Sequence, residues 1–106
     1  MIRTILPNRR PSITVDANWQ GMPLTVTVGF DLDGVVREVF ADAPGSVGVV
    51  VSDASTVISI ALQHDIPAPE LAKSLGRAPD FTGGKMIDAP ASPIGVIINC
   101  IIEAST

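Results

Sequence analysis

The sequence predicts an α+β fold, in which a three-stranded antiparallel sheet packs against a long central helix and a C-terminal helix. Three observations predict it. Residues 24–30 alternate apolar and semi-polar side chains, as a strand with one buried face does. The dipeptide Asp33-Gly34 is typical of a tight hairpin turn. Residues 49–64 are too many for a strand and repeat apolar residues at helical spacing.

The chain begins with an extended basic arm over residues 1–11, because prolines punctuate it and no periodicity is present. Arg9 and Arg10 lie side by side in this arm. Residues 12–106 then form a single domain, and this length suffices to bury a core without disulfides.

The predicted strands cover residues 12–18, 24–30 and 35–40. The first alternates apolar and polar residues, and Gln20-Gly21 turns the chain into the second. Three antiparallel strands with one apolar face need another layer that packs on this face and buries it. The rest of the chain is expected to supply it.

The central helix over residues 49–64 is apolar on nearly all sides, so we expect it to be buried on more than one side. A short helix follows over residues 70–75, and residues 77–91 are expected to be a loop that is functional or mobile. The segment 94–104 combines strand propensity with a helix-start signal, Ser92-Pro93. We choose helix for it.

Composition excludes several classes of protein. The net charge of −4 and the 4% aromatic content disfavour nucleic-acid binding. The single cysteine excludes an intramolecular disulfide and a thiolate zinc site. No apolar run is long enough for a signal peptide or a membrane span, so we expect a soluble, cytoplasmic protein. The 46% apolar content favours a homo-oligomer with buried apolar surface between subunits.

The order of these pieces resembles the TSCPD domain, an accessory module near the C-terminus of adenosylcobalamin-dependent ribonucleotide reductases that also occurs as short stand-alone proteins. The resemblance covers nearly the whole chain. It is carried by Val26-Thr27-Val28 through Asp31, Asp33-Gly34, Glu38-Val39-Phe40, the glycines that follow, Ile58-Ser59-Ile60-Ala61-Leu62, Pro69-Glu70-Leu71 and Leu75-Gly76.

The chain departs from this family at its cysteines. In the naming motif a cysteine precedes the proline and an aspartate follows it, whereas Ser92 and Ile94 flank Pro93 here. The stretches Met22-Pro23 and Ser46-Val47-Gly48 also lack the cysteines that family members often carry there. Metal or redox roles of those cysteines therefore do not transfer. The reductase reaction needs several cysteines and a radical cofactor in a large barrel, so kinship with a reductase does not imply catalysis by this chain.

No set of side chains composes a catalytic or metal site in this interpretation, and no cofactor is expected. His64 is the only histidine and is interpreted as a helix-end residue favoured by the helix dipole. Asp31 and Asp33 resemble the start of a calcium loop, but the required later ligands are missing, so a hairpin turn is favoured.

Two candidate binding sites remain. Gly45, Ser46 and Gly48 precede the central helix, where exposed amides attract anions, although the lysine of a phosphate-binding loop is absent. Partner binding is assigned to Arg9 and Arg10 of the arm and to Trp19, which either anchors an interface or covers the edge of the core.

The leading hypothesis is a non-catalytic accessory or regulatory module related to ribonucleotide reductase, which acts by protein–protein binding or self-association. One alternative is a small-molecule or nucleotide-binding domain that uses the loop over residues 45–48. Another is a component associated with ribonucleoside-diphosphate reductase. The predicted partners are a second copy of the chain and a reductase or other protein.

Overall fold

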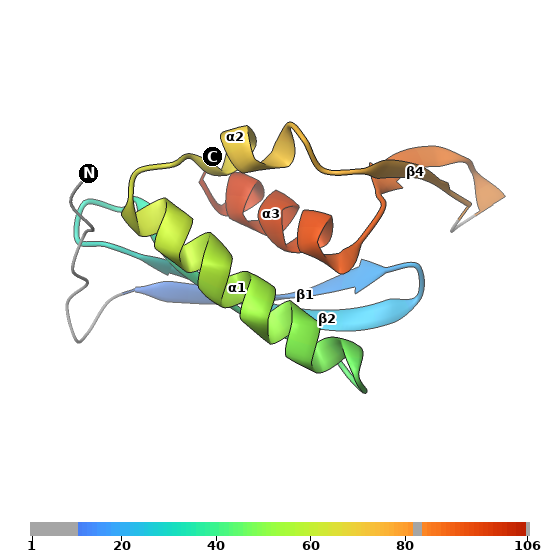
Figure 1. Ribbon diagram of the computed structural model, residues 1–106, viewed down its shortest axis with the longest axis horizontal. Helices are drawn as coiled ribbons and strands as arrows, with labels where there is room; N and C mark the ends of the chain where they lie inside the picture. Colours follow the sequence, from blue (N-terminus) through green and yellow to red (C-terminus); the bar gives the residue numbers. More distant parts are fainter. Residues whose placement is uncertain (1–10, 82–83, 106) are drawn as a thin grey trace.

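The computed structural model describes residues 11–81 and 84–105, which form a three-stranded antiparallel sheet, a small second sheet and three helices (Figure 1). The elements are β1 (Ser12–Trp19), β2 (Met22–Phe30), β3 (Val36–Asp42), α1 (Val47–Gln63), α2 (Ala68–Ala72), β4 (Arg77–Asp80), β5 (Ile87–Pro90) and α3 (Pro93–Ala104). The first three strands pair in the order β1-β2-β3. The predicted α+β fold is confirmed.

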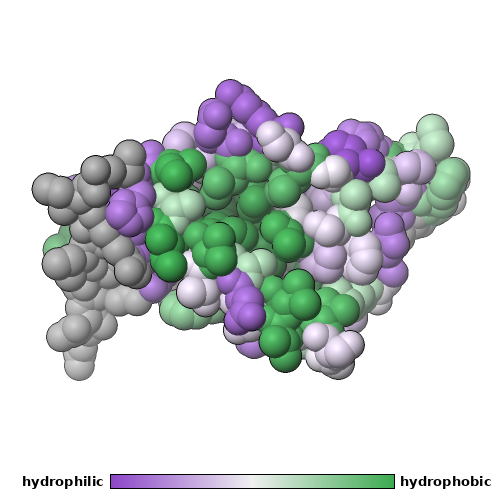
Figure 2. Space-filling view, viewed as in Figure 1, coloured by the Kyte–Doolittle hydropathy of each residue, from purple (hydrophilic) through white to green (hydrophobic). Residues whose placement is uncertain are grey.

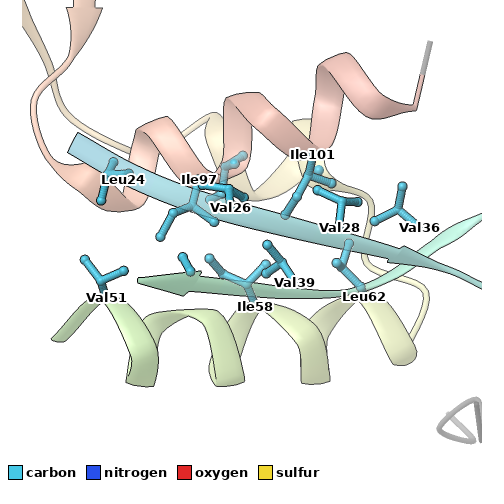
Figure 3. Close-up of a cluster of buried hydrophobic side chains, with 13 residues drawn as sticks. Leu24, Val26, Val28, Val36, Val39, Val51, Ile58, Leu62, Ile97 and Ile101 are labelled. Atoms are coloured by element: carbon cyan, nitrogen blue, oxygen red, sulfur yellow. The ribbon is translucent and has the colours of Figure 1, made fainter. Parts of the chain in front are cut away.

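The core lies between one face of this sheet and the helices α1 and α3. The even-numbered residues of β2, Leu24, Val26 and Val28, are buried and meet apolar side chains of both helices. Figure 3 shows Val51, Ile58 and Leu62 of α1 and Ile97 and Ile101 of α3 converging on them. Each fully buried aliphatic side chain of this kind contributes about 1.5–3 kcal/mol to folding.

The turn between β1 and β2 consists of Gln20 and Gly21, as the sequence predicts. Both residues have positive φ, 49° and 86°, which is the geometry of a two-residue hairpin that follows the twist of its strands. The amide N–H of Gly21 donates to the side-chain oxygen of Asn18 at 2.8 Å, which closes the turn.

The connection between β2 and β3 is longer than the predicted tight turn at Asp33-Gly34. It spans residues 31–35, and within it only Gly34 has positive φ, at 80°. The reason is the side chain of Asp31, whose Oδ1 accepts from the amides of Asp33 and Val35 at 2.9 and 3.0 Å. An aspartate that binds its own loop replaces the second positive-φ residue.

The central helix α1 ends in a capping motif that uses an aspartate where glycine is usual. Asp65 has φ of 64°, the amide of Ile66 donates to the carbonyl of Ala61 at 3.0 Å, and that of Asp65 to the carbonyl of Leu62 at 3.1 Å. These two bonds satisfy carbonyls of the last turn.

The prediction that α1 is buried on more than one side is wrong for the described chain, because its outer side is exposed. The helix covers the sheet with one face only, and no other described element lies over the opposite face.

The predicted loop over residues 77–91 is also wrong, because β4 and β5 form a two-stranded antiparallel hairpin that projects at one end of the molecule (Figure 1). The guanidinium of Arg77 donates to the carboxylate and the carbonyl of Asp88, both at 3.1 Å. The amide of Ala91 donates to the carbonyl of Gly76 at 2.9 Å. These bonds hold together strands that have little apolar alternation.

The C-terminal segment is a helix, as chosen from the sequence. Ser92 is extended and lies at the N-cap position, followed by Pro93 in the first turn, although the serine side chain makes no capping hydrogen bond. Burial of Ile97, Ile98 and Ile101 explains why residues of strand propensity form a helix here.

Candidate functional site

The most distinctive surface of the described chain is the outer face of α1. Val49, Val50, Val57 and Ile60 lie on it with exposed fractions of 68, 59, 67 and 40%. These four residues and Asp53 are called the outer face below. On the opposite side of the helix, Val51, Ile58 and Leu62 are buried in the core. An exposed apolar helix face of this kind is typical of a protein-interaction site.

Only one charged side chain interrupts this apolar surface. Asp53 is the single charged residue between Val47 and Gln63, and it is exposed. Figure 2 shows apolar surface gathered over the side of the molecule on which α1 lies, broken by a small polar area. The sequence does not predict this site, because an almost wholly apolar helix indicates burial on all sides. The position of Asp53 is the signal that marks the exposed side.

The rotation of α1 about its axis is fixed by hydrogen bonds to the edge of β3. The amide of Val39 donates to Oγ of Ser59 at 2.9 Å, and this hydroxyl donates to the carbonyl of Val39 at 3.1 Å. The side chain of Gln63 donates to the carbonyl of Arg37 at 3.3 Å. These hydrogen bonds fix the rotation of α1, so that the side chains of the outer face keep pointing away from the sheet.

Arg37 fastens the C-terminal end of α1. Its guanidinium donates to the carboxylate of Asp31 and to the carbonyl of Leu62, both at 3.0 Å, and it forms an ion pair with Asp65. The hydrogen bonds to Asp65 and Asp31 raise the pKa of Arg37. The amide of Val35, aided by Arg37, lowers the pKa of Asp31. This cluster joins the β2–β3 connection to the helix end, which is a structural role.

The predicted anion-binding residues form the turn that leads into α1. Gly45 has φ of 70°, and its carbonyl accepts from the amide of Gly48 at 3.1 Å. A Cβ on Gly48 would lie 2.5 Å from the carbonyl oxygen of Ala43. Ser46 is the N-cap residue and makes no side-chain capping bond. Backbone conformation and lack of space for a side chain therefore explain why glycine occupies positions 45 and 48. Ligand binding at Gly45, Ser46 and Gly48 stays a prediction.

Of the predicted partner-binding residues, Trp19 is the one that the structure describes. Trp19 is half-buried, ends β1 and packs against the core, and its indole N–H is buried with no hydrogen-bond partner among the described residues. Arg9 and Arg10, with nearly all of the arm over residues 1–11, lie outside the described residues. Their role in partner binding stays a prediction.

A groove between α1 and β3 carries several hydroxyl groups, but they already bind the protein. Ser55 donates to the carbonyl of Val51 at 2.9 Å, Thr56 to that of Ser52 at 3.3 Å, and Ser59 is bonded to Val39. Hydroxyls engaged with backbone have less capacity left to select a ligand.

Residues 3–104 match the family of the TSCPD domain. The chain belongs to the TSCPD domain family. The match spans β1 through α3, so the family unit and the fold described above coincide. The searches among curated proteins and among solved structures found no match.

In this TSCPD chain, the segments that lack the family cysteines lie toward one end of the molecule. There β2 begins with Met22, α1 begins after Ser46, and α3 begins after Ser92 (Figure 1). Cys100 lies two turns into α3, half-buried, and burial raises the pKa of its thiol. Over residues 11–81 and 84–105, no three His, Cys, Asp or Glu side chains are grouped so that they could hold a metal ion.

The remaining sequence interpretations concern single residues. His64 is the C-cap residue of α1, as its helix-end interpretation predicted, with its amide bonded to the carbonyls of Ile60 and Ala61.

In the described part of this TSCPD chain, no helix has the length and apolarity required to cross a membrane.

Proposed function

We propose that this TSCPD chain is a non-catalytic accessory module that acts by binding a protein through the outer face of α1. The observation that carries the proposal is the exposure of Val49, Val50, Val57 and Ile60 on a helix whose rotation is fixed by Ser59. Apolar surface exposed without a partner costs solubility, and proteins retain such patches mainly where a partner covers them.

The family membership makes a ribonucleotide reductase subunit the first heterologous partner to test. In the wider family the TSCPD domain is an accessory part of such enzymes, and an accessory role in trans needs a docking surface. Arg9 and Arg10 of the arm are a second contact in this proposal, because arginines favour an acidic partner surface. We place the protein in the cytoplasm, where its lone cysteine stays reduced.

The test is a binding titration between the purified chain and the purified reductase subunit of the same organism. If this subunit is what covers the outer face, Val57→Asp weakens binding at least tenfold, because a carboxylate in an apolar interface must be desolvated. Leu32→Asp is the matched control, since Leu32 is 80% exposed at the β2–β3 connection and lies off the outer face. Equal affinities of all three proteins would contradict a role for the outer face.

The same titration with an Arg9→Ala, Arg10→Ala double variant tests the arm. We expect a weaker complex whose loss grows at low ionic strength, because exposed charge pairs are screened by salt. A double variant that binds as the unmodified chain does would remove the arm from the proposal and leave the outer face in it.

A further inference from the structure

The exposed side of α1 contains a regular seam that its apolar residues alone do not explain. The seam residues are separated by three, four, three and four positions, and they are Val50, Asp53, Val57, Ile60 and His64. This is the heptad spacing with which one helix packs along another. Asp53, Val57, Ile60 and His64 fall within about 60° of each other around the helix axis. Of these, Asp53, Val57 and Ile60 are exposed and His64 is half-exposed.

The two ionisable residues of the seam are placed for an antiparallel partner of the same sequence. Asp53 and His64 are the only ionisable residues from Val47 to His64, and they lie about 16 Å apart along the helix. Along the helix, the midpoint between Asp53 and His64 coincides with the midpoint between Val57 and Ile60. A two-fold axis through that point therefore sets Val57 opposite Ile60 of the other copy, and Asp53 opposite its His64.

The alternatives fit the seam less well. In a parallel pair, residues of the same number meet, so that Asp53 would face Asp53 and two carboxylates would share an apolar interface. In the antiparallel pair, each residue at one heptad position meets a residue at the other heptad position, as in antiparallel helix pairs in general. The Asp53 carboxylate of each copy therefore meets the His64 imidazole of the other. The exposed Val50 then approaches the segment around Ile66 and Pro67 of the other copy, which is partly apolar and exposed.

We infer that the protein bound by the outer face is a second copy of this chain, held by α1 and its symmetry mate as an antiparallel helix pair with Asp53 opposite His64. This inference rests on the proposed function and names its partner. The arrangement is closed by a two-fold axis, the commonest symmetry of soluble homo-oligomers. Each copy offers only a few exposed apolar side chains, which makes a small interface, so we expect a dissociation constant in the micromolar range.

The support that α1 receives from the rest of the domain suits this role. Ser59 binds β3 on the side of the helix away from Val57, and Arg37 anchors the helix end directly beside His64, through Leu62 and Asp65. The middle of the seam and its C-terminal end are thus held in place before association. Pre-organisation of this kind reduces the entropic cost of binding.

The first experiment is sedimentation equilibrium of the purified full chain at protein concentrations up to about 1 mM, a range that detects even weak association. We expect a monomer–dimer equilibrium for the unmodified chain and for Leu32→Asp. Val57→Asp is expected to raise the dissociation constant at least tenfold. Circular dichroism of each variant checks that the fold is retained, which we expect because Val57 and Leu32 are both exposed.

The second experiment tests the register by charge exchange. Asp53→Lys alone should weaken the dimer, because a lysine would face His64, and His64→Glu alone should weaken it, because two carboxylates would then meet. We expect a five- to tenfold loss for each single variant. The double variant Asp53→Lys, His64→Glu sets a lysine opposite a glutamate and should return to within about twofold of the unmodified chain. A double variant no tighter than the singles would overturn the antiparallel register.

The inference and the proposed function fail in different ways. A chain that remains monomeric at every concentration, or a dimer insensitive to Val57→Asp, overturns the inference. If that monomeric chain still binds the reductase subunit in a manner sensitive to Val57→Asp, the proposed function stands with another occupant of the outer face. If neither association occurs, both are wrong.

Discussion

The side chain of Ser59 on α1 completes the backbone hydrogen bonding of Val39 at the outer edge of β3. The Val39 amide donates to Ser59 Oγ at 2.9 Å, and the hydroxyl donates back to the Val39 carbonyl at 3.1 Å. An edge strand with free amides and carbonyls invites pairing with other chains. This serine closes the edge at its centre and at the same time sets which side of α1 faces outward.

Replacement of Ser59 by alanine is therefore expected to lower the free energy of unfolding by about 1–3 kcal/mol, because the Val39 amide and carbonyl lose their partner. Urea unfolding measured by circular dichroism gives this value. Thr56→Ala is the control, since its hydroxyl bonds only to a carbonyl of its own helix at 3.3 Å in an exposed position. A change of less than 0.5 kcal/mol is expected there. Equal losses for the two variants would contradict the role given to Ser59.

The main sheet and the helices could be predicted because their patterns are local. Alternation in residues 24–30 and helical spacing in residues 49–64 reflect which side chains face the core, and both elements occur where predicted. The hairpin of β4 and β5 could not be predicted in this way. Pro79 and Pro90 lie within its strands, and a distant pair, Arg77 and Asp88, holds them together.

The functional surface was harder to predict than the fold. An apolar helix sequence does not reveal which of its sides the protein leaves uncovered, because that depends on tertiary contacts such as the bond between Ser59 and Val39. From the sequence, a binding site is instead expected at Gly45, Ser46 and Gly48, because they precede the exposed amides at the start of the helix. The apolar content indicates surplus apolar surface, and the structure shows part of it on Val57 and Ile60.

The stability of the fold should depend on pH through Asp31. Hydrogen bonds from the Val35 amide and Arg37 lower the pKa of this carboxyl in the folded state. A lowered folded pKa stabilises the fold above the unfolded pKa of about 3.9, and this contribution disappears as the pH falls through the folded value. We expect Asp31→Asn to flatten the decline in stability below pH 4, measured by urea unfolding at several pH values. Parallel curves for the variant and the unmodified chain would contradict this.

Gly95 allows α3 to approach the end of β5. A Cβ on Gly95 would lie 2.6 Å from Cβ of Pro90. Alanine is a better helix former than glycine by about 1 kcal/mol, yet steric overlap in a packed site costs about 1–3 kcal/mol. We therefore expect Gly95→Ala to lower the unfolding temperature. In a double-mutant cycle with Pro90→Gly, the two changes should be coupled in the favourable direction, and strict additivity would show that this contact does not limit the packing.

Substitution of Trp19 tests whether its buried indole N–H, which has no hydrogen-bond partner among the described residues, reduces stability. Phenylalanine keeps much of the apolar contact with the core and removes the unpaired indole N–H. The loss of volume and the removal of an unsatisfied group oppose each other, so we expect Trp19→Phe to change the free energy of unfolding by less than about 1 kcal/mol. Trp19→Ala should cost about 2 kcal/mol or more. A loss for phenylalanine as large as that for alanine would show that the N–H has a partner.

Cys100 should react slowly with thiol reagents in the folded protein. Burial, reinforced by the negative charge of Glu103, raises the pKa of its thiol and reduces the thiolate that attacks such reagents. At pH 8 we expect reaction with a chromogenic disulfide to be at least tenfold slower in buffer than in denaturing urea. Glu103→Gln should increase the folded-state rate severalfold while leaving the rate in urea unchanged, because only the folded chain holds the two side chains together. Equal rates with and without urea would mean that Cys100 is freely accessible, and the packing of α3 against β1 would then be looser than described.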